Sequence, residues 1–492
     1  MQLPDNVDLT SLAKQAMRER GLLPEFPARV IDEVSHLKEA ARPTEHTVLD
    51  LRSQLFFSID NDDSRDLDQL TYAESLSDGL YKIYVAIADV DALVKTGSAI
   101  DQYAQTNTVS VYTPSKIFTM LPEKLSTNLT SLNEDQDRLA IVIEVTVAAD
   151  GSVGDNNSLY QAQVRNCAKL AYNGLAAWLN GNSPPPSPRI SSIAGLQEQI
   201  QLQDQIAQLL KKYRQEQGSL TLETIEAHPI VKNSQVVEVT ALETNRARFL
   251  IEEFMIAANT ATSRFLRTHQ QASLRRVVRI PKRWDRVVEI AQERGEKLPD
   301  EPDAKALNLF LIKQQASDPV RFPDLSLTII KLLGRGEYVV EYPGQAPIGH
   351  FNLAVKDYTH STAPNRRFPD LITQRLVKSL IENKNAPYTV QELEDLAARC
   401  TEKSADADKV ERKMRKCATI LLLFSKLNQT FKGIVTGSSF KGTWVRIFDP
   451  PTEGKLVKGY EHLDVGDQII VKLVHLDIEK GFIDFERAQL KQ

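Results

Sequence analysis

The stretch SIDNDDSRDLDQL, residues 58–70, carries five aspartates within nine residues, directly after the apolar run at 55–57. Like charges this close repel one another, so a folded chain keeps them together when a cation lies between them. Asp66 and Asp68 are two residues apart, which in an extended segment places both on one face, with backbones about 6.6–6.8 Å apart. Together with Asp60 they could share hard divalent cations, and two Mg²⁺ ions about 4 Å apart assist displacement at phosphorus. The pattern therefore favours metal-assisted phosphodiester chemistry.

Two other interpretations of this acidic stretch stay open from the residues alone. It could be a solvated turn, as most acidic loops are. It could also be a calcium loop, since aspartates stand at the first and third positions of residues 60–71, but the glycine at position six and the glutamate at position twelve are missing. The chain contains no P-loop, His-Glu-x-x-His or GxGxxG motif, so other phosphate and metal sites have less support.

The elements that position these carboxylates follow from the periodicity of apolar residues. We expect helices within residues 1–45, an extended run at 47–60, a buried strand at 79–94 and a further strand at 138–153 that ends in an Asp-Gly turn. Further helices are predicted at 192–218, at 244–269, from near Asp370 and across 389–426. The last 65 or so residues read as short strands between turns, which suggests a five-stranded OB-type barrel.

Composition narrows the class of protein. The 492 residues, 42% apolar and 25% charged, suit about three globular domains with a large core. A net charge of −5 argues against non-specific coating of nucleic acid, although it allows a basic channel. Cys167, Cys400 and Cys417 are too few for a disulfide framework. Without a signal peptide or an apolar run long enough to span a membrane, a soluble cytoplasmic protein with no membrane partner is predicted.

Four other stretches accompany the acidic one. They are YVAIADVDALV at 84–94, SVYTPSKIFTMLPEKLSTNLTSLNEDQDRLAIVIEV at 110–145, RFLIEEFMIAAN at 248–259 and IGHFNLAVKDYTHSTAPNRRFPDLITQRLV at 348–377. In this order the five blocks resemble the RNase II/RNB exoribonuclease family over about residues 55–377. The resemblance implies an α+β fold in which a mixed sheet is surrounded by helices. We expect an N-terminal helical segment (1–45), an RNB catalytic domain (46–388), a helical connector (389–426) and an OB-fold RNA-binding domain (427–492).

The family hydrolyses single-stranded RNA from a free 3′ end, releasing nucleoside 5′-monophosphates with Mg²⁺. The resemblance implies this reaction here, with Mg²⁺, or Mn²⁺ in its place, held by Asp60, Asp66 and Asp68, and with Asp68 as the most critical carboxylate. The family usually has a fourth aspartate, and here that position is Gln69, which carries no charge. Asp62 and Asp63 are interpreted as local charge.

The other blocks imply contacts to RNA. Arg366 matches the family arginine at the scissile phosphate, where a guanidinium neutralises developing charge, and Arg367 beside it is expected on the RNA backbone or on a structural carboxylate. Tyr112 matches an aromatic that stacks on bases. Glu252, or its neighbour Glu253, matches a carboxylate on the terminal sugar. Two further features are less specific: Glu411 could be another such contact, and Ala363 and Asn365 depart from the usual Ser and Ile.

Two basic tracts, at 275–283 and 411–416, are either solvated faces or the lining of an RNA channel. Bacterial members of the family usually carry two cold-shock domains before the catalytic domain, and the roughly 45 residues here are too few for one, so looser anchoring of RNA is expected. A monomeric exoribonuclease acting on single-stranded RNA with a free 3′ end is the leading hypothesis. The alternatives are an RNA-binding regulator on a catalytically weakened RNB scaffold, and an RNA-binding protein that depends on the C-terminal barrel alone.

Overall fold

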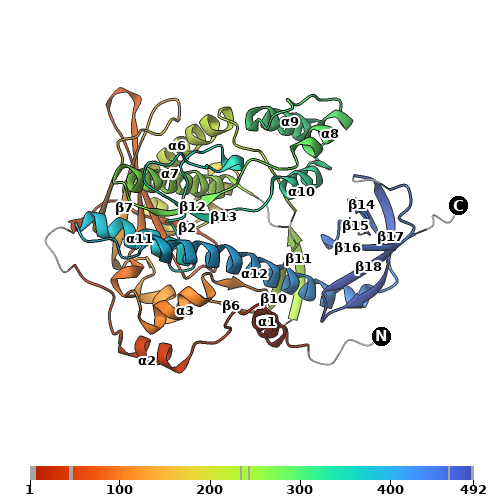
Figure 1. The fold of residues 1–492 in the computed structure, drawn as a ribbon, viewed down its shortest axis with the longest axis horizontal. Coiled ribbons are helices and arrows are strands. Elements are labelled where there is room, and N and C mark those ends of the chain that lie inside the picture. Colours follow the sequence, from red (N-terminus) through yellow and green to blue (C-terminus); the bar gives the residue numbers. More distant parts are fainter. Residues whose placement is uncertain are drawn as a thin grey trace.

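The structure is a computed structural model that describes residues 7–43, 48–225, 227–232, 235–241, 244–440, 442–463 and 466–488. Its largest sheet, which contains the strand labelled β7 in Figure 1, has five strands in the order β1-β8-β7-β4-β3. The bounds of these strands are β1 Leu49–Asp50, β3 Gln69–Ser75, β4 Tyr81–Ala88, β7 Asp137–Val147 and β8 Ser158–Arg165. All neighbours in this sheet are antiparallel except β1 and β8, so the sheet is mixed as predicted.

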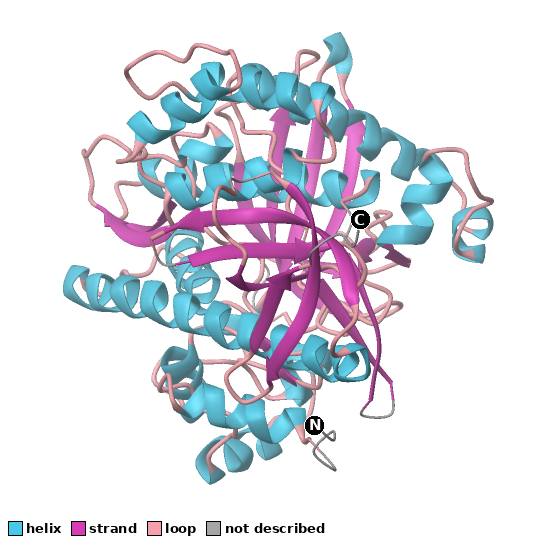
Figure 2. Cartoon of the chain, turned by 90° about the vertical axis from the view of Figure 1, so that its right-hand side faces the viewer, coloured by secondary structure: helices cyan, strands magenta, loops and turns pink. Residues whose placement is uncertain are grey.

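The two central strands carry the continuous apolar runs of the sequence. Val85 and Ile87 of β4 and Val142 and Val145 of β7 are almost completely buried, because both faces of the sheet are covered, and residues on either side of the pleat become apolar. The main core joins this sheet to the helices α3 Ala99–Asn107, α4 Tyr172–Leu179, α6 Leu196–Glu216, α7 Arg246–Thr268 and α11 Phe368–Ile381. Figure 2 shows the strands in the middle of the molecule with helices around them.

Short elements beside the sheet hold the acidic stretch. Strand β2 (Ser58–Asp60) pairs in parallel with β9 (Lys169–Ala171), and β5 (Val111–Tyr112) pairs with β6 (Ile117–Phe118). The expected single extended run at 47–60 is wrong in detail, because it is divided into β1 and β2. The chain turns at Leu51–Gln54, where the amide of Gln54 donates to the carbonyl of Leu51, and then joins a different strand.

Two N-terminal helices, α1 (Leu9–Arg18) and α2 (Ala28–His36), agree with the expected helical segment. Met17 of α1 is buried in a core that it shares with Val111 and Phe118 of the β5–β6 hairpin and with Val410 of α12 (Val390–Leu423). This packing is a direct consequence of the apolar spacing seen in residues 9–17. The N-terminal segment thus forms part of the support under the hairpin that carries Tyr112.

The remaining elements complete the middle of the chain. A small helical unit with its own core around Trp284 comprises three helices. The other bounds in this region are α5 Pro188–Ser192, β10 Ala227–Lys232, β11 Gln235–Ala241, β12 Ser273–Val277, α8 Trp284–Glu293, α9 Ala304–Ser317, α10 Phe322–Leu333 and β13 Glu337–Glu341. Strands β10 and β11 pair with each other, as do β12 and β13.

The C-terminal part is a closed barrel in the strand order β14-β15-β16-β18-β17, which confirms the predicted OB-type architecture. The strands are β14 Thr430–Ser439, β15 Gly442–Ile447, β16 Thr452–Lys458, β17 Gln468–Asp477 and β18 Phe482–Arg487. Helix α12 runs from the part of the molecule that contains the large sheet to this barrel (Figure 1), and Ile420 and Leu423 at its end lie in the barrel core. Within the described ranges no helix is long and apolar enough to cross a membrane.

Candidate active site

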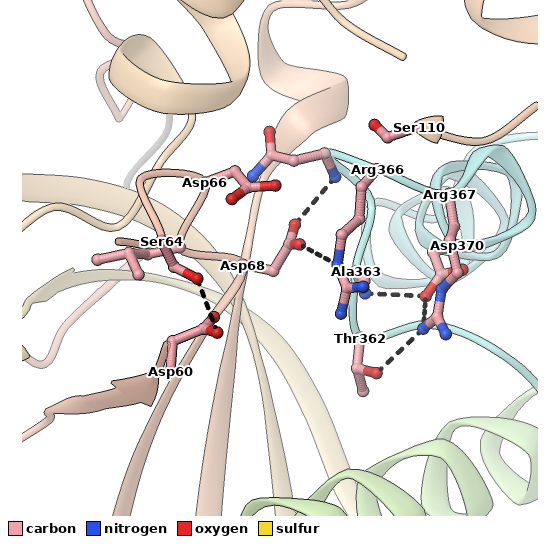
Figure 3. Close-up of polar contacts among 12 residues, drawn as sticks. Asp60, Ser64, Asp66, Asp68, Ser110, Thr362, Ala363, Arg366, Arg367 and Asp370 are labelled. Carbon is pink, nitrogen blue, oxygen red and sulfur yellow. Dashed lines mark hydrogen bonds and ion pairs between the residues drawn. The ribbon is translucent and has the colours of Figure 1, made fainter. Parts of the chain in front are cut away.

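The acidic stretch begins at the end of β2, where Asp60 is half-buried. Its Oδ1 accepts hydrogen bonds from the amide of Asn61 at 2.7 Å and from the hydroxyl of Ser64 at 3.0 Å. These two bonds close a tight turn, because a short acidic side chain can bond to its own following backbone. The turn brings the chain back, so that Asp60, Asp66 and Asp68 lie around a common space (Figure 3).

Between the last two of these aspartates, Leu67 anchors the segment to the core. Its side chain is buried, its amide donates to the hydroxyl of Ser131 at 3.0 Å, and its carbonyl accepts from the amide of Leu132 at 2.9 Å. Because side chains alternate along an extended chain, burying Leu67 directs Asp66 and Asp68 away from that anchor. The apolar residue between the two carboxylates is therefore what aims them at the site.

Asp68 is only 1% exposed, and the chain supplies two donors to it. Its Oδ1 accepts from the amide of Asn365 at 3.0 Å, and its Oδ2 lies 3.2 Å from Nε of Arg366. The side chain of Arg366 is 43% exposed, so it binds the buried carboxylate while part of it remains accessible to solvent. This pairing confirms that blocks far apart in the sequence meet at one point.

The loop that carries Arg366 is fixed by its backbone. The carbonyl of Arg366 accepts from the amide of Ser110 at 3.0 Å, and the amide of Phe368 donates to the carbonyl of Thr108 at 2.8 Å. Asp370 caps the loop by accepting from the amide of Ala363 at 2.8 Å. The arginine is thus held on rigid backbone, which suits a group that must stay aligned with a substrate.

The electrostatics of the cluster show too little positive charge for its carboxylates. Burial, aided by the charge of Asp66, raises the pKa of Asp68 to about 7, even though Arg366 acts in the opposite direction. Burial also raises the pKa of Asp66, with a contribution from Asp60. Burial lowers the pKa of Arg366, but the nearby negative groups outweigh this, so its pKa lies above the ordinary value. A further cation in this space would relieve the repulsion.

Tyr112 approaches the same cluster from β5. Its hydroxyl donates to Oδ2 of Asp66 at 3.3 Å, and its amide donates to Oε1 of Glu411 on α12 at 2.9 Å. Burial raises the pKa of Tyr112, so the hydroxyl stays protonated and acts as a donor at neutral pH. The structure places Tyr112 at the carboxylates, and its stacking on RNA bases stays a prediction.

The structure separates the two glutamates that the sequence left open. Glu253 is 2% exposed and forms a bidentate pair with Arg214, at 2.6 and 2.7 Å. The side chain of Glu252 is 51% exposed and lies 3.9 Å from Arg214. Glu253 is therefore committed to the fold, and Glu252 is the more accessible of the two glutamates. Its role at the terminal sugar stays a prediction.

Arg367 differs from its neighbour Arg366. One Nη atom of Arg367 lies 2.7 Å from Oδ1 of Asp370, which is completely buried, and 3.5 Å from the hydroxyl of Thr362 (Figure 3). This pairing favours the structural carboxylate among the two partners expected for Arg367. Contact of Arg367 with RNA remains an untested prediction.

Two residues near Asp60, Tyr172 and Arg248, were missed by sequence reasoning. Ala171 of β9 is the register partner of Asp60, so Tyr172 follows directly beside the acidic turn. The guanidinium carbon of Arg248 lies 4.4 Å from the centre of the Tyr172 ring, and its Nη2 donates to Oδ1 of Asn61 at 2.9 Å. The parallel pairing of β2 with β9 brings Tyr172 beside the acidic turn, and helix α7 brings Arg248 there, so no local motif signals the contact.

The first basic tract is largely part of the fold. Arg275 is 3% exposed, and its guanidinium lies 3.0 Å from the carboxylate of Glu341. The guanidinium carbon of Arg276 lies 4.8 Å from the centre of the Tyr338 ring. Arg279 forms an ion pair with Glu337. Because Arg275 is buried in an ion pair, it belongs neither to a solvated face nor to the lining of a channel, the two interpretations left open for this tract. The sequence could not reveal this, because the carboxylate partners come from β13.

The oxygen atoms available in the acidic cluster suit a divalent metal ion. Carboxylate oxygens from Asp60, Asp66 and Asp68 are the hard ligands that Mg²⁺ prefers, and the raised pKa values of two of them favour a bound cation. Gln69, at the start of β3, is 7% exposed and contributes a neutral amide where the family has a fourth acid. Across the described residues no three His, Cys, Asp or Glu side chains already converge as a metal site. The chemistry fits the ion, and the ligands would have to close on it.

Comparisons with known proteins agree with this geometry. Residues 48–383 match the RNB domain, and residues 429–488 match the RNase II-type exonuclease C-terminal S1 domain. Ribonuclease R of Vibrio cholerae is 29% identical over 96% of the chain and 61% of its own length. The chain spans about three fifths of the length of the first curated relatives it matches.

Solved structures share the fold. Mycoplasma genitalium RNase R in complex with ribose-methylated single-stranded RNA has a TM-score of 0.88 at 24% identity, covering 99% of this chain and 79% of that one. Yeast Ssd1, a pseudonuclease, has a TM-score of 0.72 at 16% identity, covering 95% and 58%. Since a nuclease and a pseudonuclease share this architecture, the side chains of the site and not the fold must carry any functional conclusion.

Proposed function

Because the chain belongs to the RNB exoribonuclease family, we propose that it hydrolyses single-stranded RNA processively from a free 3′ end and releases nucleoside 5′-monophosphates. The observation that carries this proposal is the pairing of buried Asp68 with half-exposed Arg366 inside a cluster of three aspartates. A cluster that only stabilised the fold would have its charges matched, whereas this one keeps carboxylates with raised pKa values beside an arginine open to solvent.

Asp60, Asp66 and Asp68 would hold Mg²⁺, with Mn²⁺ as the alternative ion. A bound divalent ion supplies polarisation of the phosphoryl oxygens and lowers the pKa of the attacking water. The hydroxyl of Tyr112 orients Asp66, since it donates to Oδ2 and leaves Oδ1 for a ligand. Asn365 and Arg366 fix both oxygens of Asp68 in the same way.

Arg366 acts on the substrate itself. Its Nε is used by Asp68, and the remainder of the guanidinium can donate to a non-bridging oxygen of the scissile phosphate. Negative charge on these oxygens grows as water attacks phosphorus, so a fixed donor there stabilises the transition state more than the ground state. The bond from phosphorus to the 3′ oxygen of the preceding nucleotide breaks, and that oxygen takes a proton.

The division of labour along the chain follows the expected domains. The catalytic reaction is assigned to residues 46–388, with 389–426 as the connector and 427–492 as an RNA-binding barrel that guides a single strand toward the site. The match of residues 429–488 to the S1 domain supports the barrel's role. We propose a monomer, because the residues assigned to the site all come from one chain.

The test compares single-stranded RNA labelled at the 5′ end with the same RNA labelled at the 3′ end, incubated with the protein and Mg²⁺. Wild-type protein should release labelled mononucleotide first from the 3′-labelled strand, and the Asp68→Asn variant should release none. Asp63→Asn is the matched control, because Asp63 is an exposed aspartate of the same loop and its loss should leave the rate unchanged.

The result that overturns the proposal is wild-type protein that leaves both labelled strands intact with Mg²⁺ and with Mn²⁺. Internal cleavage of the 5′-labelled strand before mononucleotide appears would also contradict it, because it would indicate an endonuclease. Equal loss of activity in Asp63→Asn and Asp68→Asn would contradict the assignment of the site.

A further inference from the structure

Arg248 lies at the edge of the acidic site, and although it opens the block at 248–259, no role was assigned to it above. It stands in the first turn of α7, and its backbone amide donates to the side chain of the N-cap residue Asn245 at 3.0 Å. Its guanidinium packs on the ring of Tyr172 and donates to Asn61, the residue that follows Asp60. The side chain is thus held in one orientation beside the turn that shapes the site.

This position is unfavourable for a cation. The first turn of a helix carries partial positive charge, so an arginine there is repelled unless an anion compensates it. The other arginine of the turn, Arg246, has such an anion, because its Nε and Nη2 donate to the two carboxylate oxygens of Asp204 at 2.9 and 2.6 Å. For Arg248, no carboxylate of the described ranges lies within 4.0 Å of its nitrogens, and its Nε is buried without a hydrogen-bond partner.

The surroundings indicate where the missing anion would come from. Burial raises the pKa of Tyr172, the charge of Asp60 adds to this, and Arg248 and Arg366 oppose it, so these three charged groups are near the Tyr172 ring. Arg366 approaches the carboxylates from the loop before α11, and Arg248 approaches from α7 on the side of the acidic turn. Glu252, the more accessible of the two glutamates, is one helical turn further along α7 and therefore on the same face as Arg248.

We propose that Arg248 binds a phosphate near the 3′ end of the RNA and acts with Arg366 to hold the terminal nucleotides across the carboxylates. This inference rests on the proposed function and extends it to a second phosphate contact. One face of the guanidinium is already stacked on Tyr172, which leaves its in-plane N–H groups as the donors for a ligand. In-plane donors suit phosphate oxygens, which accept charge-assisted hydrogen bonds.

The experiment measures binding instead of cleavage, so that it does not depend on the reaction. A dye-labelled ten-nucleotide single-stranded RNA with a free 3′ end is titrated, by fluorescence anisotropy, with Asp68→Asn protein and with the same protein carrying Arg248→Met. The titrations are repeated at several salt concentrations. Lys212→Met is the matched control, because it removes one exposed positive charge from α6.

Loss of one phosphate contact predicts about tenfold weaker binding for Arg248→Met and a log–log salt dependence that is shallower by about 0.7. Lys212→Met should change neither quantity. Arg248→Lys keeps the charge but not the fork or the stack, so it should restore the salt dependence with only part of the affinity. It also serves as the second variant if Arg248→Met melts at a lower temperature.

RNAs in which one phosphate is replaced by an uncharged linkage identify the phosphate that Arg248 binds. RNAs with a single methylphosphonate at one of the three 3′-terminal linkages remove one phosphate charge at a time. At one linkage the neutral RNA should bind the Arg248 parent about tenfold more weakly, while the Arg248→Met protein should not distinguish it from normal RNA. Equal additional loss in both proteins at every linkage would overturn the inference.

Weaker binding with an unchanged salt dependence would also overturn it, because that result indicates base stacking. The two failures are distinguishable. If wild-type protein cleaves RNA while Arg248→Met binds as its parent does, only the second phosphate contact is wrong. If wild-type protein does not cleave and the coupling at one linkage is still seen, the proposed function fails and the contact stands; if no protein binds RNA, both fail.

Discussion

Asp89, Asp91 and Asp101 form a second group of three aspartates, and the cations around them differ from those around Asp60, Asp66 and Asp68. Lys378 lies 2.9 Å from both Asp89 and Asp91, and Arg375 reaches Asp91 at 3.0 Å and Asp101 at 2.8 Å. All of these side chains are buried or nearly so. The second group therefore receives its positive charge from α11.

The pKa shifts of the two groups have opposite signs. Burial acts to raise the pKa of Asp91, but Lys378 and Arg375 outweigh it, and the result lies below the ordinary value. For Asp66 and Asp68 burial prevails, and their pKa values are raised. The comparison teaches that buried carboxylates with a structural role are neutralised by nearby lysine and arginine, whereas those at the site where we propose a divalent ion are less fully neutralised.

The largest effect should come from the site with too little positive charge. Asp66→Asn removes a proposed metal ligand, and we expect activity on 3′-labelled RNA to fall on the order of 10³-fold. The same substitution removes charge repulsion, so the metal-free variant should melt at the same or a higher temperature than wild type. A drop in both activity and melting temperature would mean that Asp66 serves the fold, as Asp91 does.

Removing a cation from the group of Asp89, Asp91 and Asp101 should lower the stability of the fold. Lys378→Met leaves Asp89 and Asp91 buried with less compensation, which costs about 3–5 kcal/mol of unfolding free energy. Urea denaturation followed by circular dichroism measures this loss. The matched control is Lys384→Met at an exposed ion pair with Glu382, for which a change of about 0–1 kcal/mol is expected. A similar loss of unfolding free energy in Lys378→Met and Lys384→Met would contradict a structural role for Lys378.

The pH dependence of the free energy of unfolding should also distinguish the two groups of aspartates. The pKa of Asp68 is about 7 in the folded chain and 3.8 ordinarily, so between these values the folded state binds more protons. Stability of the metal-free protein therefore falls as pH rises, by about 2–3 kcal/mol from pH 5 to pH 7. Asp68→Asn should remove this slope in thermal melts recorded with a chelator. A slope that persists in the variant would assign it to another group.

The smallest expected effect is at the hydroxyl of Tyr112. Tyr112→Phe removes one hydrogen bond to Asp66 and keeps the ring, so we expect less than about a fivefold loss in kcat/KM on short RNA. Tyr112→Ala should lose clearly more, because it also removes the ring predicted to stack on bases. Initial-rate measurements on both variants decide between the two roles, and equal losses would show that only the hydroxyl contributes.

Much of the architecture could be predicted from the sequence because its signals are local. The apolar run of β4 and the helix at 390–423 follow from periodicity, and the barrel follows from short strands between turns. The division of residues 47–60 into β1 and β2 could not be predicted. It depends on a change of partner strand, from β8 to β9, which no property of the segment itself records.

In the site too, residues within one stretch of sequence could be predicted, and contacts between distant elements could not. Asp60, Asp66 and Asp68 were found because they lie within one stretch, and Arg366 because its block resembles a family. Tyr172 was missed because it comes near Asp60 only through the pairing of β2 with β9, and Arg248 was missed because its contacts with Tyr172 and Asn61 depend on where α7 packs. The partner of Arg275 was unpredictable for a similar reason, since Glu341 belongs to another strand.

Helix α12 contacts the site and the barrel without interruption. Glu411 accepts from the amide of Tyr112, and Ile420 and Leu423, on the same helix, pack inside the barrel. A single residue inserted between these points would advance the barrel by only about 1.5 Å but would rotate it by about 100° around the helix axis. The angular phase of α12, more than its length, therefore sets which side of the barrel is turned toward the carboxylates.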